Sequence, residues 1–159
     1  MEAVAGRRAR TVGRAGEDAL PGFRSAAEAR EVLDAMFRMV NDDERIGALL
    51  RATRLRIRYE LTDLELVVNV ATAEGMDENI RWAFSDDGDW TPKLSLSMDS
   101  ATANAYLQGR TSLPIAIARG RVRCSGDTRT TLLYLPANRL VVEPYRRIVR
   151  DRYPHLALA

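Results

Sequence analysis

Apolar residues along this chain are spaced in two ways, and the spacing changes twice. Between about residues 54 and 98, apolar and polar residues alternate, which is typical of strands with one buried and one solvated face. On both sides of this stretch the apolar residues recur every three or four positions, as they do along one face of a helix. The pattern predicts a sheet that is flanked in the sequence by helices.

The alternating stretch predicts four strands, and a fifth follows later in the chain. The first strand covers residues 54–61, where every second residue is apolar. Short connections such as Thr62-Asp63 favour antiparallel pairing between neighbouring strands. The other strands are predicted at residues 64–70, 80–84, 94–98 and 121–125.

Two helices are predicted before the sheet. Ser25 is a suitable N-cap, and Glu28 stands three residues later, as in a capping box. The apolar residues that follow at helical spacing end at the polar break 41–43. A second, short helix then carries Ile46 and Leu50.

Glycine and proline mark the limits of the later helices. Residues 100–108 are predicted to form a helix that ends at Gly109, and a shorter helix follows that ends at Gly120. A last helical stretch reaches towards the C-terminus. We expect Pro136 and Pro144 to kink or segment it, because proline lacks the backbone N–H that an inner helical turn uses.

These elements predict the fold class and the domain limits. A sheet with one apolar face needs one helical cover, so we expect an α+β fold with a five-stranded, mostly antiparallel sheet and helices packed on one face. A chain of 159 residues fits one domain. Residues 1–22 are rich in Arg, Gly and Ala and are expected to form a disordered basic tail, with the domain at residues 23–159.

The composition argues against several classes of partner and active site. The chain has 24 Lys and Arg against 22 Asp and Glu, a net charge of +2, and this balance gives no strong field for nucleic acid. The single cysteine, Cys124, excludes an internal disulfide framework. The single histidine, His155, argues against a histidine-rich metal site and a Ser-His-Asp triad. We therefore expect no nucleic-acid partner, no metal and no cofactor.

The sequence also bears on where the protein acts. No apolar run is long enough to cross a bilayer. The first residues contain Arg but lack the apolar segment of a secretory signal. We therefore expect a cytoplasmic protein.

The segment 94–127 resembles the sterol carrier protein type 2 sterol-binding domain family. The resemblance lies in the order of its features: a strand that ends in Met98-Asp99, a helix that closes on Leu107-Gln108-Gly109, and a second helix that contains Pro114. A basic strand then closes on Ser125-Gly126-Asp127. A looser similarity covers about residues 26–150, and the chain looks like a bacterial single-domain member.

This resemblance implies a five-stranded sheet, helices on one face and an apolar cavity between the two layers. It also implies binding or transfer of sterols, fatty acyl groups or other lipids. Family members have no universal catalytic motif, so the catalytic residues of any reaction stay unknown.

Two sets of apolar residues are candidates for the walls of such a cavity, because methionine adapts to irregular guests and aromatic rings give large rigid surfaces. The same stripes are also typical of an ordinary core. The candidates on the sheet are Leu66, Val68, Trp82, Phe84, Leu96 and Met98. The candidates on the helices are Met36, Met39, Leu107, Ile115, Ile117, Leu132 and Leu135.

The sequence favours a non-catalytic protein that binds or carries an apolar small molecule such as a lipid, an acyl chain or a polyketide-like compound. The alternative is a cofactor-independent cyclase or isomerase of secondary metabolism in the same cavity. A polar side chain that points into the cavity, such as Tyr59, Tyr106 or Glu74, would favour the enzyme. Transient contact with a membrane or with a biosynthetic enzyme, and the oligomeric state, stay open.

The solvated side of the sheet is expected to be basic. This face either keeps the sheet soluble or binds an anionic partner, and the first interpretation is favoured. Cys124 follows the alternation of Val122, so it is expected to point inward as a small apolar side chain. The loop 86–89 is interpreted as a turn and not as a calcium site. The basic residues are Arg54, Arg56, Arg58, Arg81, Lys93, Arg121 and Arg123.

Overall fold

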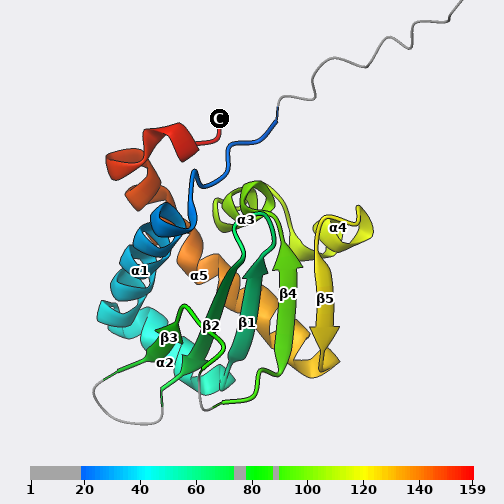
Figure 1. The fold of residues 1–159 in the computed structure, drawn as a ribbon. Helices are drawn as coiled ribbons and strands as arrows, with labels where there is room; N and C mark the ends of the chain where they lie inside the picture. The colour runs from blue at the N-terminus through cyan, green and yellow to red at the C-terminus, as the bar shows by residue number, and fades with distance from the viewer. Residues whose placement is uncertain (1–18, 74–77, 88–89) are drawn as a thin grey trace, which may run out of the picture.

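The chain folds into a five-stranded sheet covered on one face by helices, as the alternating pattern predicted (Figure 1). This computed structural model describes residues 19–73, 78–87 and 90–159. The strand order is β3-β2-β1-β4-β5. β1 and β4 are parallel, and the other three neighbouring pairs are antiparallel. The strands are β1 Arg56–Leu61, β2 Leu66–Thr72, β3 Ile80–Ala83, β4 Leu94–Met98 and β5 Arg123–Gly126.

The helices form the second layer, and α5 is the element that joins them. Figure 1 shows α5 crossing behind the sheet, and it packs against α1, α2 and α3. No helix of the described part of the chain is both long and apolar enough to cross a membrane. The helices are α1 Ala26–Asp42, α2 Glu44–Thr53, α3 Ser100–Leu107, α4 Leu113–Ala118, α5 Thr128–Arg152 and the short 3-10 helix η1 Pro154–Leu156.

The predicted N-cap of the first helix is confirmed. The Oγ atom of Ser25 accepts a hydrogen bond from the backbone N–H of Glu28 at 3.0 Å. The Glu28 carboxylate accepts from the backbone N–H of Arg24 at 2.7 Å, one residue earlier than in a standard capping box. Its other oxygen contacts Nε2 of His155, so the start of α1 is tied to η1.

Two details of the later elements differ from the prediction. α5 continues through Pro136 and Pro144 as one helix, so its predicted segmentation is wrong. Each proline removes one backbone hydrogen bond from the helix. The packing of α5 against three other helices offsets this loss and keeps the helix continuous. β5 begins at Arg123 and not at Arg121, because the backbone N–H groups of Arg121 and Val122 bond to the carbonyl of Ala116 at the end of α4.

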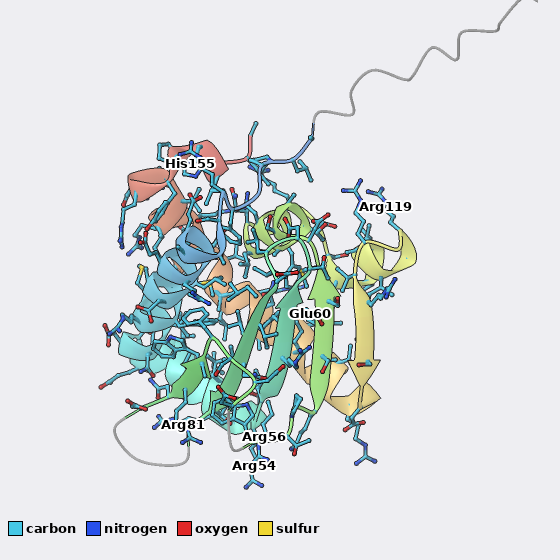
Figure 2. The ribbon with its side chains drawn as sticks, in the orientation of Figure 1. Arg54, Arg56, Glu60, Arg81, Arg119 and His155 are labelled. Carbon is cyan, nitrogen blue, oxygen red and sulfur yellow. The ribbon has the colours of Figure 1, made fainter. Side chains whose placement is uncertain are left out.

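The outer face of the sheet is less basic than the sequence predicted. Arg54 caps α2 in the left-handed region with φ 48°, and it is not part of β1. Arg58 donates from Nε and Nη2 to the two carboxylate oxygens of Asp86 at 2.9 and 3.0 Å. This hydrogen bond from Arg58 lowers the pKa of Asp86. Figure 2 shows Arg56 and Arg81 at one end of the sheet and Arg119 at the other.

Most of the predicted tail, residues 1–18, lies outside the described residues. Residues 19–22 are described, and the carbonyl of Pro21 accepts a hydrogen bond from Nδ2 of Asn104 at 2.9 Å. Asn104 is fully buried in α3. The end of the predicted tail is therefore attached to the domain.

Candidate ligand cavity

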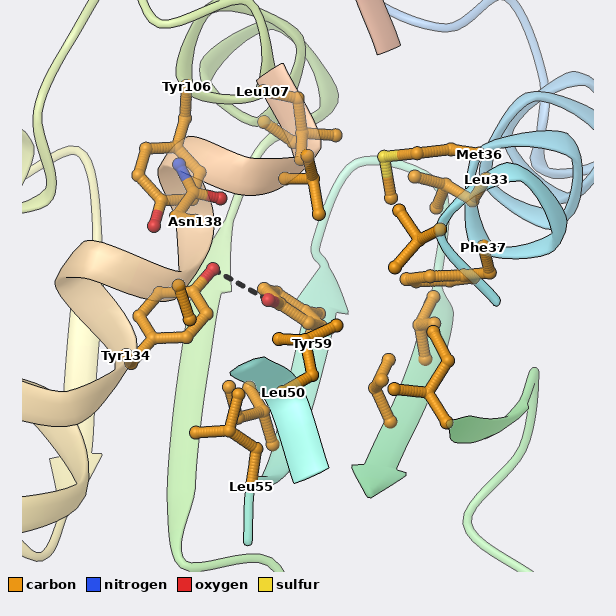
Figure 3. A pocket seen from close by; sticks show the side chains of 18 of the residues that line it. Leu33, Met36, Phe37, Leu50, Leu55, Tyr59, Tyr106, Leu107, Tyr134 and Asn138 are labelled. Atoms are coloured by element: carbon orange, nitrogen blue, oxygen red, sulfur yellow. Dashed lines mark hydrogen bonds between the residues drawn. The ribbon is translucent and has the colours of Figure 1, made fainter. Parts of the chain in front are cut away.

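An apolar cavity of about 80 Å³ lies between the sheet and the helices (Figure 3). The register of the sheet creates its floor, because Ile57, Tyr59 and Leu61 stand beside apolar residues of β2 and β4 on the same face. The α1 helix contributes one wall and α5 the opposite one. The wall residues include Leu33, Met36, Phe37 and Val40 from α1, Ala103, Tyr106 and Leu107 from α3, and Tyr134, Ala137, Asn138 and Val141 from α5.

The structure brings four of the predicted ligand residues to this cavity and places the others elsewhere. Those at the cavity are Met36, Val68, Met98 and Leu107. Leu66 and Leu96 are buried in the core beside it. Met39, Trp82, Phe84 and Leu135 are half-buried and pack against the core. The side chain of Leu132 lies outside the described residues.

Trp82 is held away from the cavity by its own contacts. Its Nε1–H donates to Oδ1 of Asp34 at 3.0 Å. Its ring centroid lies 5.5 Å from that of Phe37, which itself lines the cavity. The indole therefore packs against the side of Phe37 that faces away from the cavity and does not line the cavity itself.

Ile115 and Ile117 are exposed, at 48% and 38% of their surface. The sequence analysis placed both isoleucines among the candidate wall residues, but residues two apart point in different directions on a helix. The structure buries Leu113 and Ala116, which are three residues apart. The inward orientation of both isoleucines was therefore a wrong prediction.

Cys124 is also exposed, although the sequence predicted that it points inward as a core residue. It stands opposite Leu96 in the pairing of β4 and β5. β5 is the last strand of the sheet. In the described part of the chain, no three His, Cys, Asp or Glu residues lie together in a way that could hold a metal ion.

Sequence reasoning missed most of the wall that α5 provides. Its wall residues are Tyr134, Ala137, Asn138 and Val141. They follow the spacing i, i+3, i+4, i+7, which is the signature of one helix face. Because Pro136 and Pro144 predicted a kinked or segmented helix, this continuous face was not recognised in the sequence.

Three tyrosines gather at one end of the cavity. The hydroxyl groups of Tyr59 and Tyr134 are 2.6 Å apart and share one hydrogen bond. The ring centroid of Tyr106 lies 6.2 Å from that of Tyr134. Figure 3 shows Tyr106, Tyr134 and Asn138 on one side, with Tyr59 facing them from the sheet. This end carries most of the polar groups of a largely apolar wall, whose other polar lining residue is Thr72 on β2.

The three phenols remain neutral under ordinary conditions. Burial raises the pKa of Tyr59 and of Tyr106, and it raises the pKa of Tyr134 as well. A neutral phenol donates one hydrogen bond and accepts others. The cluster can therefore orient a polar atom of a bound molecule.

A surface pocket of about 520 Å³ lies next to the cavity, between α5 and the α3–α4 segment. Arg110, Arg119 and Arg139 contribute to its rim. Tyr106 and Asn138 line both this pocket and the inner cavity. These two side chains form the partition between the cavity and the surface.

No protein-family model and no curated protein matches this chain. Solved structures do match it. Sterol carrier protein 2 from Yarrowia lipolytica, in its apo form, aligns with a TM-score of 0.54 at 7% identity, over 77% of this chain and 94% of that one. The sterol carrier protein domain 2 of Helicoverpa armigera aligns with a TM-score of 0.52 at 13% identity, over 72% and 87%.

The ubiquinone synthesis protein UbiJ-SCP2 aligns with a TM-score of 0.51 at 15% identity, over 72% of this chain and 88% of that one. The chain spans only 14% of a larger protein that it also matches, the sec-alkylsulfatase Pisa1 from Pseudomonas sp., with a TM-score of 0.46. The chain thus has the fold of the sterol carrier protein 2 domains, as the residues 94–127 indicated.

Proposed function

From the fold shared with sterol carrier proteins, we propose that this protein binds and carries an apolar small molecule in the cavity between its two layers. The supporting observation is the cavity itself, whose described lining residues include no Asp, Glu, His, Lys, Arg or Cys. Of the residues expected from the sequence, we propose that Met36, Val68, Met98 and Leu107 contact the ligand. Burial of apolar surface provides the driving force.

The size of the cavity requires that it enlarge when a ligand binds. Pockets for small molecules usually measure about 300–1,000 Å³, and this cavity measures about 80 Å³. Displacement of Tyr106 and Asn138 would join it to the surface pocket of about 520 Å³. The joined space falls within the usual range, and the partition gives the ligand a route from the surface.

Carrying is favoured over catalysis by the kind of polar groups at the cavity. The enzyme alternative relies on proximity and on a few acid or hydrogen-bonding groups, and any step that abstracts a proton also needs a base. Tyr59 and Tyr106 do reach the cavity, but burial raises the pKa of both phenols and keeps them neutral. Glu74, the other residue named for this role, lies outside the described residues. Neutral phenols suit recognition of a ligand better than proton abstraction.

Native mass spectrometry of the gently purified full chain tests the proposal, with an organic extract to identify the bound molecule. A variant that fills the cavity sharpens the test. Ala137 is buried and lines the cavity, so Ala137→Leu should weaken binding of methyl heptyl ketone by about tenfold or more in calorimetric titration. Leu49→Phe, which adds bulk at an exposed position, is the control.

For this comparison, the Ala137→Leu variant must show a cooperative thermal unfolding transition like that of the unaltered protein. Equal affinity of both variants for the ketone would contradict binding in the cavity. So would the absence of any bound apolar molecule together with no ketone binding by the unaltered chain.

A further inference from the structure

The tyrosine cluster contains more hydrogen-bond donors than the protein uses. Each of the three neutral phenols has one O–H proton. The contact between Tyr59 and Tyr134 uses one of these protons, since one hydroxyl donates and the other accepts. The hydroxyl of Tyr106 forms no hydrogen bond of good geometry with a described residue, although it lies near enough to the Tyr134 hydroxyl for each to influence the pKa of the other. Two of the three protons therefore have no well-placed acceptor among the described residues.

One unused proton belongs to Tyr106, which is 4% exposed. The other belongs to either Tyr59 or Tyr134, because either hydroxyl of that pair could be the donor, and Tyr134 is 3% exposed. A buried donor without an acceptor costs about 1–3 kcal/mol, so such groups are rare in folded proteins unless a water molecule or a ligand completes them. All three tyrosines line the cavity (Figure 3). The missing acceptor therefore belongs in the cavity.

We propose that the ligand carries a neutral carbonyl oxygen, which accepts hydrogen bonds from Tyr106 and from the unused O–H of the Tyr59–Tyr134 pair. This inference rests on the proposed function and names the class of molecule. A carbonyl oxygen has two lone pairs, which match two donors that converge on one end of the cavity. The rest of the ligand is apolar, like most of the remaining wall.

The same wall discriminates against other head groups. A hydrocarbon leaves both donors unsatisfied. A carboxylate accepts from both phenols, but it brings a charge into a site whose described lining residues include no cation, and burial of an unpaired charge is costly. An ammonium group likewise brings a charge into a site whose described lining residues include no anion, and that burial is equally costly. An apolar ketone, aldehyde or ester is the class that fits.

The test compares three probes of matched chain length: methyl heptyl ketone, nonane and nonanoate. The expected result is that Tyr106→Phe weakens binding of the ketone by about three- to tenfold and leaves binding of nonane unchanged. The triple variant Tyr59→Phe, Tyr106→Phe and Tyr134→Phe should weaken ketone binding further, because it removes every phenol donor at the cavity. Nonanoate should bind the unaltered protein more weakly than the ketone does.

Infrared spectroscopy gives a direct readout of the contact. The stretching band of an isotope-labelled ketone carbonyl should lie at lower frequency in the unaltered protein than in the Tyr106→Phe variant, because hydrogen bonds weaken the C=O bond. Tyr145→Phe is the matched control, since Tyr145 is buried and its hydroxyl donates to Asn104 outside the cavity. It should change neither the band nor the preference between probes.

The outcomes separate this inference from the proposed function. If nonane and the ketone bind, and Tyr106→Phe affects both equally or neither, the carbonyl contact is wrong and the apolar cavity stands. If nonanoate binds more tightly than the ketone, a neutral carbonyl is wrong as the head group. If no probe binds the unaltered protein, the proposed function fails and the inference fails with it.

Discussion

Tyr106 and Tyr145 are both buried tyrosines, but their hydroxyl groups differ. The hydroxyl of Tyr145 donates to Oδ1 of Asn104 at 2.6 Å. The hydroxyl of Tyr106 forms no hydrogen bond of good geometry with a described residue. Oδ1 of Asn104 also accepts a hydrogen bond from Nε2 of Gln108 at 2.9 Å. Tyr145 therefore belongs to a hydrogen-bond network that fixes α5 to α3. The sequence gives no sign of this difference, because both residues are tyrosines on helices.

The two residues should therefore respond in opposite ways to the same change. Tyr106→Phe removes a buried donor without an acceptor and is expected to raise the free energy of unfolding by about 1 kcal/mol. Tyr145→Phe removes a satisfied hydrogen bond and is expected to lower it by about 1 kcal/mol or more. Urea unfolding of both variants measures these changes. A loss of stability in Tyr106→Phe equal to that in Tyr145→Phe would mean that a bound water completes the Tyr106 hydroxyl.

At the scale of elements, the positions of strands and helices were predicted better than the faces that the helices bury. Alternation over a short run has one structural solution, and β4 was predicted with its observed bounds of Leu94–Met98. The short helix α4 was predicted before Gly120, but the face that it buries was not predicted. Six residues do not define a helix face from the sequence alone. Packing of α1, α2 and α3 around α5 determined which faces of the other helices are buried.

A proline in the interior of α5 leads to a prediction about stability. Pro136 lies in the interior of α5, where proline removes a backbone hydrogen bond and crowds the preceding turn, at a cost of about 3 kcal/mol in an ordinary helix. Pro136→Ala is therefore expected to raise the free energy of unfolding by about 1–3 kcal/mol. Chemical denaturation of the full chain measures this.

Pro114 gives the matched control, because it lies in the first turn of α4, where a backbone N–H has no partner within the helix. Pro114→Ala is expected to leave stability unchanged or to lower it slightly, through greater freedom of the unfolded chain. Equal stabilisation by both substitutions would show that the interior position of Pro136 is not the cause.

At the scale of the whole molecule, the sequence predicted the layers and left the site open. The order of strands and helices follows from local patterns. The tyrosine cluster instead joins Tyr59 on β1, Tyr106 on α3 and Tyr134 on α5, and only tertiary packing brings these segments together. The partition between cavity and surface depends on the same packing. A single sequence therefore predicts an apolar interior but not where it remains open or which polar groups face it.

The partition predicts how a ligand enters. Asn138 lines both the cavity and the surface pocket, so Asn138→Ala should widen the passage. We expect the association and dissociation rate constants of methyl heptyl ketone to rise severalfold together, because a lower barrier acts on both directions. Trp82 packs against the cavity residue Phe37, so its fluorescence in stopped-flow mixing reports arrival of the ligand. A Trp90→Phe background removes the other tryptophan signal.

Val142→Ala is the control for this experiment, because Val142 lines the surface pocket but not the cavity. It shortens a side chain of the same pocket without opening the partition, so its rate constants should stay close to those of the unaltered protein. If Asn138→Ala and Val142→Ala change the rates equally, or if neither changes them, the ligand enters elsewhere. The route between α3 and α5 then has to be abandoned, while the cavity and its tyrosines are unaffected.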